Sequence, residues 1–77
     1  MDILLNDLTN LPHRDGQMVL FVRASNYELE AVREGEGYWL YLFVVKNGRV
    51  SYLSMVRPAA TVEDVQREGR SMLIQDP

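Results

Sequence analysis

Short apolar segments separated by turn residues dominate this chain, a pattern typical of strands. Between positions 27 and 34 the odd positions are apolar as far as Ala31, whereas three even positions carry glutamate: Glu28, Glu30 and Glu34. This alternation predicts a half-buried strand with one solvated face, interrupted only by Val32. The preceding segment, 17–23, is apolar at both odd and even positions from Met18 to Val22 and predicts a second strand.

The clearest local signal is Asn47-Gly48, which separates the apolar segments 38–46 and 49–57. Both positions of a type I′ turn need a positive φ, which Asn and Gly accept readily, so the pattern predicts a two-residue hairpin. Such a turn fixes the register of the two strands. The expected pairs are Lys46 with Arg49, Val45 with Val50, Phe43 with Tyr52, Leu42 with Leu53, Tyr41 with Ser54, Leu40 with Met55 and Trp39 with Val56.

The two ends of the chain indicate helices with different clarity. Thr61, followed by acidic residues at 63 and 64, resembles a helix cap, and the apolar positions 62, 65, 72 and 73 then share one helical face. Gly69 lies on that face, so the helix either continues to about Ile74 or ends before Gly69; the continuous helix is the preferred interpretation. At the N-terminus, four leucines at helical spacing predict a short helix over 2–11, capped by Asp2 and ended by Pro12, with a short strand as the alternative.

These elements together predict one small α+β domain over residues 1–77. We expect a four-stranded antiparallel meander with a C-terminal helix on one face and a possible short N-terminal helix. Residues 57–60 are expected to leave the sheet before that helix begins.

The composition narrows the classes of function. The 77 residues include 8 basic and 11 acidic side chains, a net charge of −3 and no cysteine, which excludes disulfides and thiolate zinc sites. An acidic balance argues against general nucleic-acid binding and against docking on anionic membranes. No apolar run is long enough for a membrane span, and the first residues carry acids where a secretion signal needs bases, so we expect a cytoplasmic protein.

No residue pattern predicts catalytic, metal-binding or cofactor-binding residues. His13-Arg14-Asp15 matches the opening of a kinase catalytic loop but lacks every accompanying motif, and His13, the only histidine, is expected to be a solvated loop residue. Glu34 and Glu36 are too few for a calcium loop, and their neighbouring glycines match no phosphate-binding motif. We therefore expect a protein that is not an enzyme.

The final hairpin, 38–57, is the feature of the sequence that indicates a function. The expected register puts aromatic residues on one face and aliphatic residues on the other, yet the C-terminal helix can cover only one of these faces. The other requires a cover, because monomers rarely expose so large an apolar patch. Three alternatives could cover this face: the leucine-rich N-terminal segment, a second copy or another protein, or stacked nucleic-acid bases. We favour protein association, most of all a homodimer, through this face or a strand edge, with single-stranded nucleic acid as the alternative; the expected anchors are Trp39, Tyr41, Phe43 and Tyr52.

Overall fold

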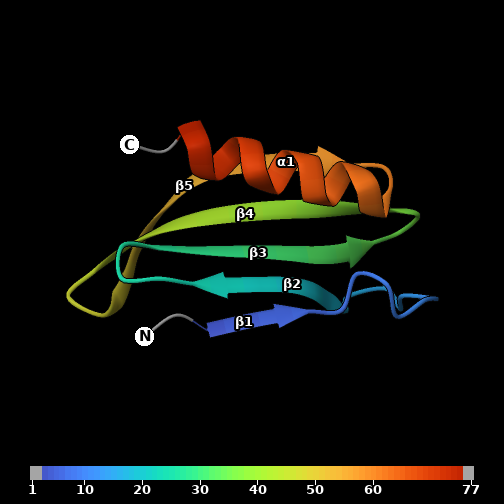
Figure 1. The fold of residues 1–77 in the computed structure, drawn as a ribbon, viewed down its shortest axis with the longest axis horizontal. Coiled ribbons are helices and arrows are strands. Elements are labelled where there is room, and N and C mark those ends of the chain that lie inside the picture. The colour runs from blue at the N-terminus through green and yellow to red at the C-terminus, as the bar shows by residue number, and fades with distance from the viewer. Residues whose placement is uncertain (1–2, 76–77) are drawn as a thin grey trace.

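The chain folds as a five-stranded antiparallel sheet with one helix across one face, in a computed structural model that describes residues 3–75 (Figure 1). The strands follow one another in sequence order as a meander. Their bounds, with those of the helix, are β1 (Ile3–Asn6), β2 (Met18–Arg23), β3 (Tyr27–Glu34), β4 (Gly37–Lys46), β5 (Arg49–Ala59) and α1 (Val62–Gln75). The predicted α+β class with a C-terminal helix is confirmed, whereas the prediction of four strands is wrong.

The fifth strand is the N-terminal segment, for which we expected a helix. β1 pairs antiparallel with β2, with Leu4 opposite Val22 and Leu5 opposite Phe21. The backbone amide of Leu8 then donates to the side-chain oxygen of Asn6 at 3.1 Å, and this turn ends the strand. Of the four leucines, only Leu8 is buried, so their helical spacing did not reflect a common buried face. The expected cap, Asp2, lies outside the described residues.

The β4–β5 hairpin has the predicted turn but not the predicted register. Asn47 and Gly48 adopt φ of 55° and 77°, as a type I′ turn requires, and the first two expected pairs form. Two register shifts in β5 then change every later pair. The observed pairs are Val44 with Tyr52, Phe43 with Leu53, Leu42 with Met55, Tyr41 with Val56, Leu40 with Arg57, Trp39 with Pro58 and Tyr38 with Ala59. β5 also continues through Ala59, where we expected the chain to have left the sheet.

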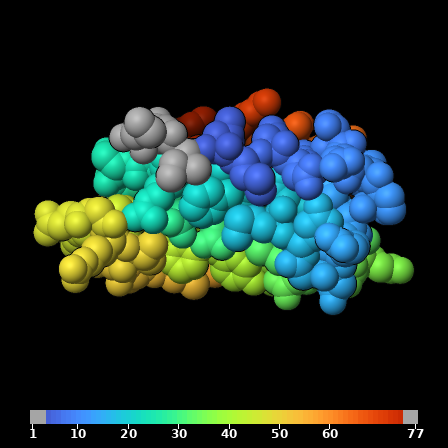
Figure 2. Space-filling view, turned by 90° about the horizontal axis from the view of Figure 1, so that it is seen from below, coloured from blue at the N-terminus to red at the C-terminus, as the bar shows by residue number. Residues whose placement is uncertain are grey.

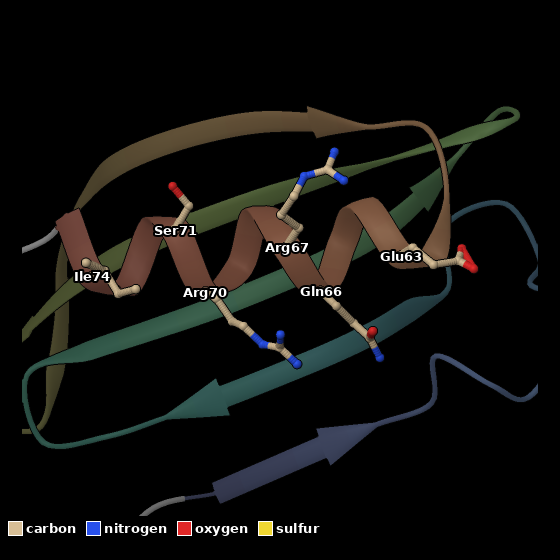
Figure 3. Close-up of a pocket in the computed structure, with 6 residues that line it drawn as sticks. All are labelled: Glu63, Gln66, Arg67, Arg70, Ser71 and Ile74. Carbon is tan, nitrogen blue, oxygen red and sulfur yellow. The ribbon is translucent and has the colours of Figure 1, made fainter.

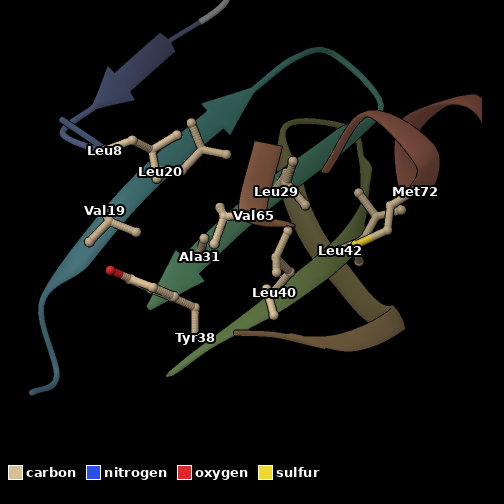
Figure 4. Packing of buried hydrophobic residues seen from close by; sticks show 11 residues of the cluster. Leu8, Val19, Leu20, Leu29, Ala31, Tyr38, Leu40, Leu42, Val65 and Met72 are labelled. Carbon is tan, nitrogen blue, oxygen red and sulfur yellow. The ribbon is translucent and has the colours of Figure 1, made fainter. Parts of the chain in front are cut away.

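Helix α1 covers the core on one face of the sheet (Figure 4). The Thr61 hydroxyl accepts a hydrogen bond from the Asp64 amide at 3.1 Å, which caps the first turn. Val65 and Met72 are fully buried against Leu40 and other residues of the sheet. The predicted continuation of the helix past Gly69 is confirmed. The helix is too short and too polar to cross a membrane, and it is the only one that the structure describes in residues 3–75.

The segment between β1 and β2 is fixed to the sheet by His13. We expected a solvated histidine, but this side chain is buried at 9% exposure. One ring nitrogen lies 2.7 Å from the Tyr38 hydroxyl on β4, and the other lies 2.8 Å from the carbonyl oxygen of Asp7. Sequence spacing gave no sign of these partners because Tyr38 is brought close only by the order of the strands.

Candidate interaction surface on the open sheet face

The face of the sheet opposite α1 is covered by no helix or strand of residues 3–75, and we call it the open face. The strand register arranges its side chains in rows that run from edge to edge of the sheet. The central row contains Leu5, Phe21, Glu30, Tyr41 and Val56. A second row contains Met18, Val32, Trp39 and Pro58, and a third contains Arg23, Glu28, Phe43 and Leu53.

Apolar side chains on the open face remain accessible. Trp39 is 39% exposed, Val56 is 42% exposed and Leu53 is 46% exposed. In Figure 2 the red and orange atoms of α1 appear only along the upper margin, while the yellow and orange atoms of β5 form part of the lower margin. The N-terminal segment is therefore not the cover considered from the sequence, because β1 extends the sheet sideways instead of crossing this face.

Three of the four expected anchors lie together on the open face. Trp39, Tyr41 and Phe43 alternate along β4 and point to the same side of the sheet. Tyr52 does not join them, since it pairs with Val44 and so points to the opposite side. Its ring there lies 5.7 Å from the ammonium of Lys46. Our assignment of Tyr52 to the aromatic face was wrong because the register shift next to it changes its side.

The register shift at Ser51 brings Leu53 onto the open face. Val56 lies on this face in both registers, opposite Trp39 in the expected one and opposite Tyr41 in the observed one. Neither residue was among the expected anchors. β2 adds Phe21, which lies opposite Glu30 of β3. No sequence signal marked the shifts, because serines at the extra positions are equally compatible with a regular strand. Phe21 could have been assigned to the open face from the alternation of side chains along β2, once the pairing of β2 with β3 was known.

One end of the open face is closed by the tip of the β4–β5 hairpin. Arg23 donates to the carboxylate of Glu28 at 3.3 Å and to the carbonyl oxygen of Gly48, in the turn, at 2.7 Å. The yellow tip accordingly lies on the side of the sheet away from α1 in Figure 2. Glu28, expected to be solvated, is buried at 7% exposure beneath this arrangement, and Val45 is buried nearby. The accessible part of the face therefore comprises the central row, the row of Trp39, and Leu53.

Carboxylates give the accessible face a negative character. Burial raises the pKa of Glu30 above its ordinary value of 4.5, and the neighbouring carboxylate of Glu28 raises it further. The Tyr41 hydroxyl donates to the Glu34 carboxylate at 2.8 Å, and this bond raises the pKa of Tyr41. Glu30 and Glu34 of β3 thus accompany the accessible aromatic side chains, an unfavourable setting for nucleic-acid phosphates.

Two other depressions in the surface are poorer candidates for a site. One lies on the solvent side of α1, where Figure 3 shows side chains that spread outward from the helix without enclosing a space. The other, between α1 and the β1–β2 side of the sheet, has a volume of about 190 Å³. This volume is below the roughly 300–1,000 Å³ of typical ligand pockets.

The residues that the structure describes form no metal-binding cluster. No group of three or more His, Asp or Glu side chains in residues 3–75 could hold a metal ion. Both ring nitrogens of His13 are engaged by Tyr38 and by the carbonyl of Asp7. Glu34 and Glu36 lie at the exposed β3–β4 turn, as expected for turn residues.

Comparison of the chain with protein-family models, with curated proteins and with solved structures finds no match. Any function must therefore be argued from the open face itself.

Proposed function

We propose that this protein is not an enzyme and acts by associating with another protein, and that its partner on the open face is a second copy of itself. The supporting observation is the set of exposed apolar side chains around Trp39, Val56 and Leu53 on a face that no described element covers. Aromatic side chains in the centre of such a patch are frequent anchors of protein interfaces. The expected cytoplasmic location is part of this proposal and rests on the sequence alone.

The size of the face suits a dimer. The molecule extends over 36 × 21 × 16 Å. One whole broad side is therefore on the order of 750 Å², an upper limit for the accessible open face that is close to the roughly 800 Å² each partner contributes to a standard interface. Stacking two open faces would give each sheet a second apolar layer, the usual arrangement for a sheet with two apolar faces. The same patch serves both copies in a two-fold dimer, which is the commonest form of self-association.

The sheet edges are less suitable for association. β1 has four residues in the part of the chain that the structure describes, and β5 contains Pro58 and two register shifts. Short strands, proline and bulges all disfavour pairing with a further strand. We therefore place the contact on the open face and not at a strand edge.

Sedimentation equilibrium over a range of protein concentrations tests the proposal, with a matched pair of variants. The wild type is expected to approach twice its 8.9 kDa monomer mass. Trp39→Ser should weaken the dimer by about 2 kcal/mol or more, roughly thirtyfold in Kd, because it removes a central aromatic anchor. Tyr52→Ser is the control, since it removes an exposed aromatic residue of the same hairpin from the opposite side of the sheet.

Three outcomes would contradict the proposal. A wild type that stays monomeric up to millimolar concentration has no self-association to explain. A dimer that is insensitive to Trp39→Ser but is lost on disruption of β1 would place the contact at the strand edge. A monomer whose Trp39 fluorescence is quenched by a single-stranded oligonucleotide in a salt-dependent manner would favour the alternative function, base stacking on the aromatic side chains.

A further inference from the structure

Glu30 occupies the middle of the open face. Its strand, β3, is the central one of the five, and its register partners on either side are Phe21 of β2 and Tyr41 of β4. The row continues outward to Leu5 of β1 and Val56 of β5. Glu30 is therefore the one carboxylic acid in a row whose other members are aromatic or aliphatic.

The charged groups around Glu30 do not compensate its charge. On β3, Glu28 is a like charge, and Glu34 accepts the hydrogen bond from Tyr41. On β2, Arg23 donates to Glu28 and to the carbonyl of Gly48. The row members on β1 and β5 are aliphatic. In agreement with this arrangement, every cause that acts on the pKa of Glu30 raises it.

We propose that association of two open faces is coupled to protonation of Glu30, so that the dimer strengthens as the pH falls below neutrality. This inference rests on the proposed function. A two-fold axis through the central strand brings the Glu30 side chain of one copy opposite that of the other. Two ionised carboxylates in a contact that excludes water repel each other and lose their hydration, whereas protonated carboxyls donate hydrogen bonds and tolerate burial.

The direction of the effect follows from proton linkage. Burial in the dimer favours the neutral carboxyl, so the dimer binds more protons than two separated copies at the same pH. Uptake of one proton per dimer lowers Kd about tenfold for each pH unit, and uptake of two protons lowers it about a hundredfold. Between about pH 7.5 and about pH 5.5, an average uptake of about half a proton per dimer is enough to lower Kd tenfold, and this is the smallest change that we expect.

The test compares the wild type with two variants that remove the same charge from different places. Glu30→Gln keeps the shape of the side chain but cannot ionise. Glu36→Gln removes one charge from the exposed β3–β4 turn, and so reports the general effect of net charge near the isoelectric point. Sedimentation equilibrium at both pH values gives the dissociation constants.

The wild type and Glu36→Gln are expected to bind at least tenfold more tightly at the lower pH. Glu30→Gln should bind tightly at both, with a change of less than threefold. Equal affinities of the wild type at the two pH values, or a pH response that persists in Glu30→Gln, would overturn the inference and leave the dimer itself standing. Absence of a dimer at both pH values would overturn the proposed function, and this inference with it.

Discussion

The Nδ1 atom of His13 lies 2.7 Å from the hydroxyl oxygen of Tyr38, which is 25 positions further along the chain. The other ring nitrogen lies 2.8 Å from the Asp7 carbonyl oxygen, which can only accept, so Nε2 carries a proton. In the neutral ring Nδ1 then accepts from Tyr38, and the same hydroxyl accepts a hydrogen bond from Arg33 at 3.1 Å. This chain of bonds holds the β1–β2 connection against β4 and gives His13 a structural role.

His13→Ala should lower the free energy of unfolding by about 1–3 kcal/mol. It removes the imidazole that bonds the part-buried Asp7 carbonyl and leaves the Tyr38 hydroxyl with Arg33 as its remaining partner. Urea denaturation followed by circular dichroism measures the change. Arg14→Ala, at the exposed neighbouring position, is the control and should change stability by no more than about 0.5 kcal/mol. A double-mutant cycle with Tyr38→Phe should show coupling, and a coupling energy of zero would rule out the contact.

Gly69→Ala should stabilise the protein by about 0.5–1 kcal/mol. A Cβ atom at this position would lie 3.5 Å from Leu29, 3.7 Å from Leu40 and 3.9 Å from Leu20, all ordinary contacts with side-chain atoms. The position is inside α1, where alanine loses less conformational entropy than glycine. Thermal unfolding should show a higher Tm, whereas a lower Tm would contradict the room for a Cβ atom between α1 and the sheet.

Arg23→Ala should destabilise the fold by about 2–3 kcal/mol, since it removes the cation that faces the buried Glu28 carboxylate. Adding Glu28→Gln to this variant should restore part of the loss, because the buried charge is then gone. Arg49→Ala, exposed in the same hairpin, should have little effect. Faster amide hydrogen exchange at the hairpin tip in Arg23→Ala alone would confirm that Arg23 holds the tip; unchanged exchange would contradict it.

Glu30→Gln should slightly stabilise the monomer at neutral pH. The pKa of Glu30 is raised in the folded state above its ordinary 4.5, so its stabilising contribution is complete below that value and is lost as the pH rises through the folded-state pKa. The gain should be about 0.5 kcal/mol or less, because the side chain is only half-buried and solvent screens it. The free energies of unfolding of the wild type and of Glu30→Gln, measured on dilute protein from about pH 4 to pH 8, should converge at the acid end. A difference that stays constant with pH would contradict ionisation of Glu30 as its origin.

Local patterns in the sequence were sufficient for the strands β2, β3 and β4, the Asn47-Gly48 turn and the C-terminal helix. Each of these depends on contacts between residues close in the chain, such as the alternation around Leu29 or the cap at Thr61. The surplus of apolar surface on the hairpin was also evident, because alternation alone shows that both of its faces are apolar. The acidic balance likewise favoured protein over nucleic acid as the partner.

Only the tertiary structure decided what lies on the second face. β1 forms because β2 offers an unpaired edge. This pairing joins distant parts of the chain, so the spacing of the leucines could not indicate it. The register shifts in β5, which turn Tyr52 away and bring Leu53 onto the open face, arise from pairing along two whole strands. Burial of His13 and Glu28 likewise depends on partners that only the folded sheet brings within hydrogen-bonding distance.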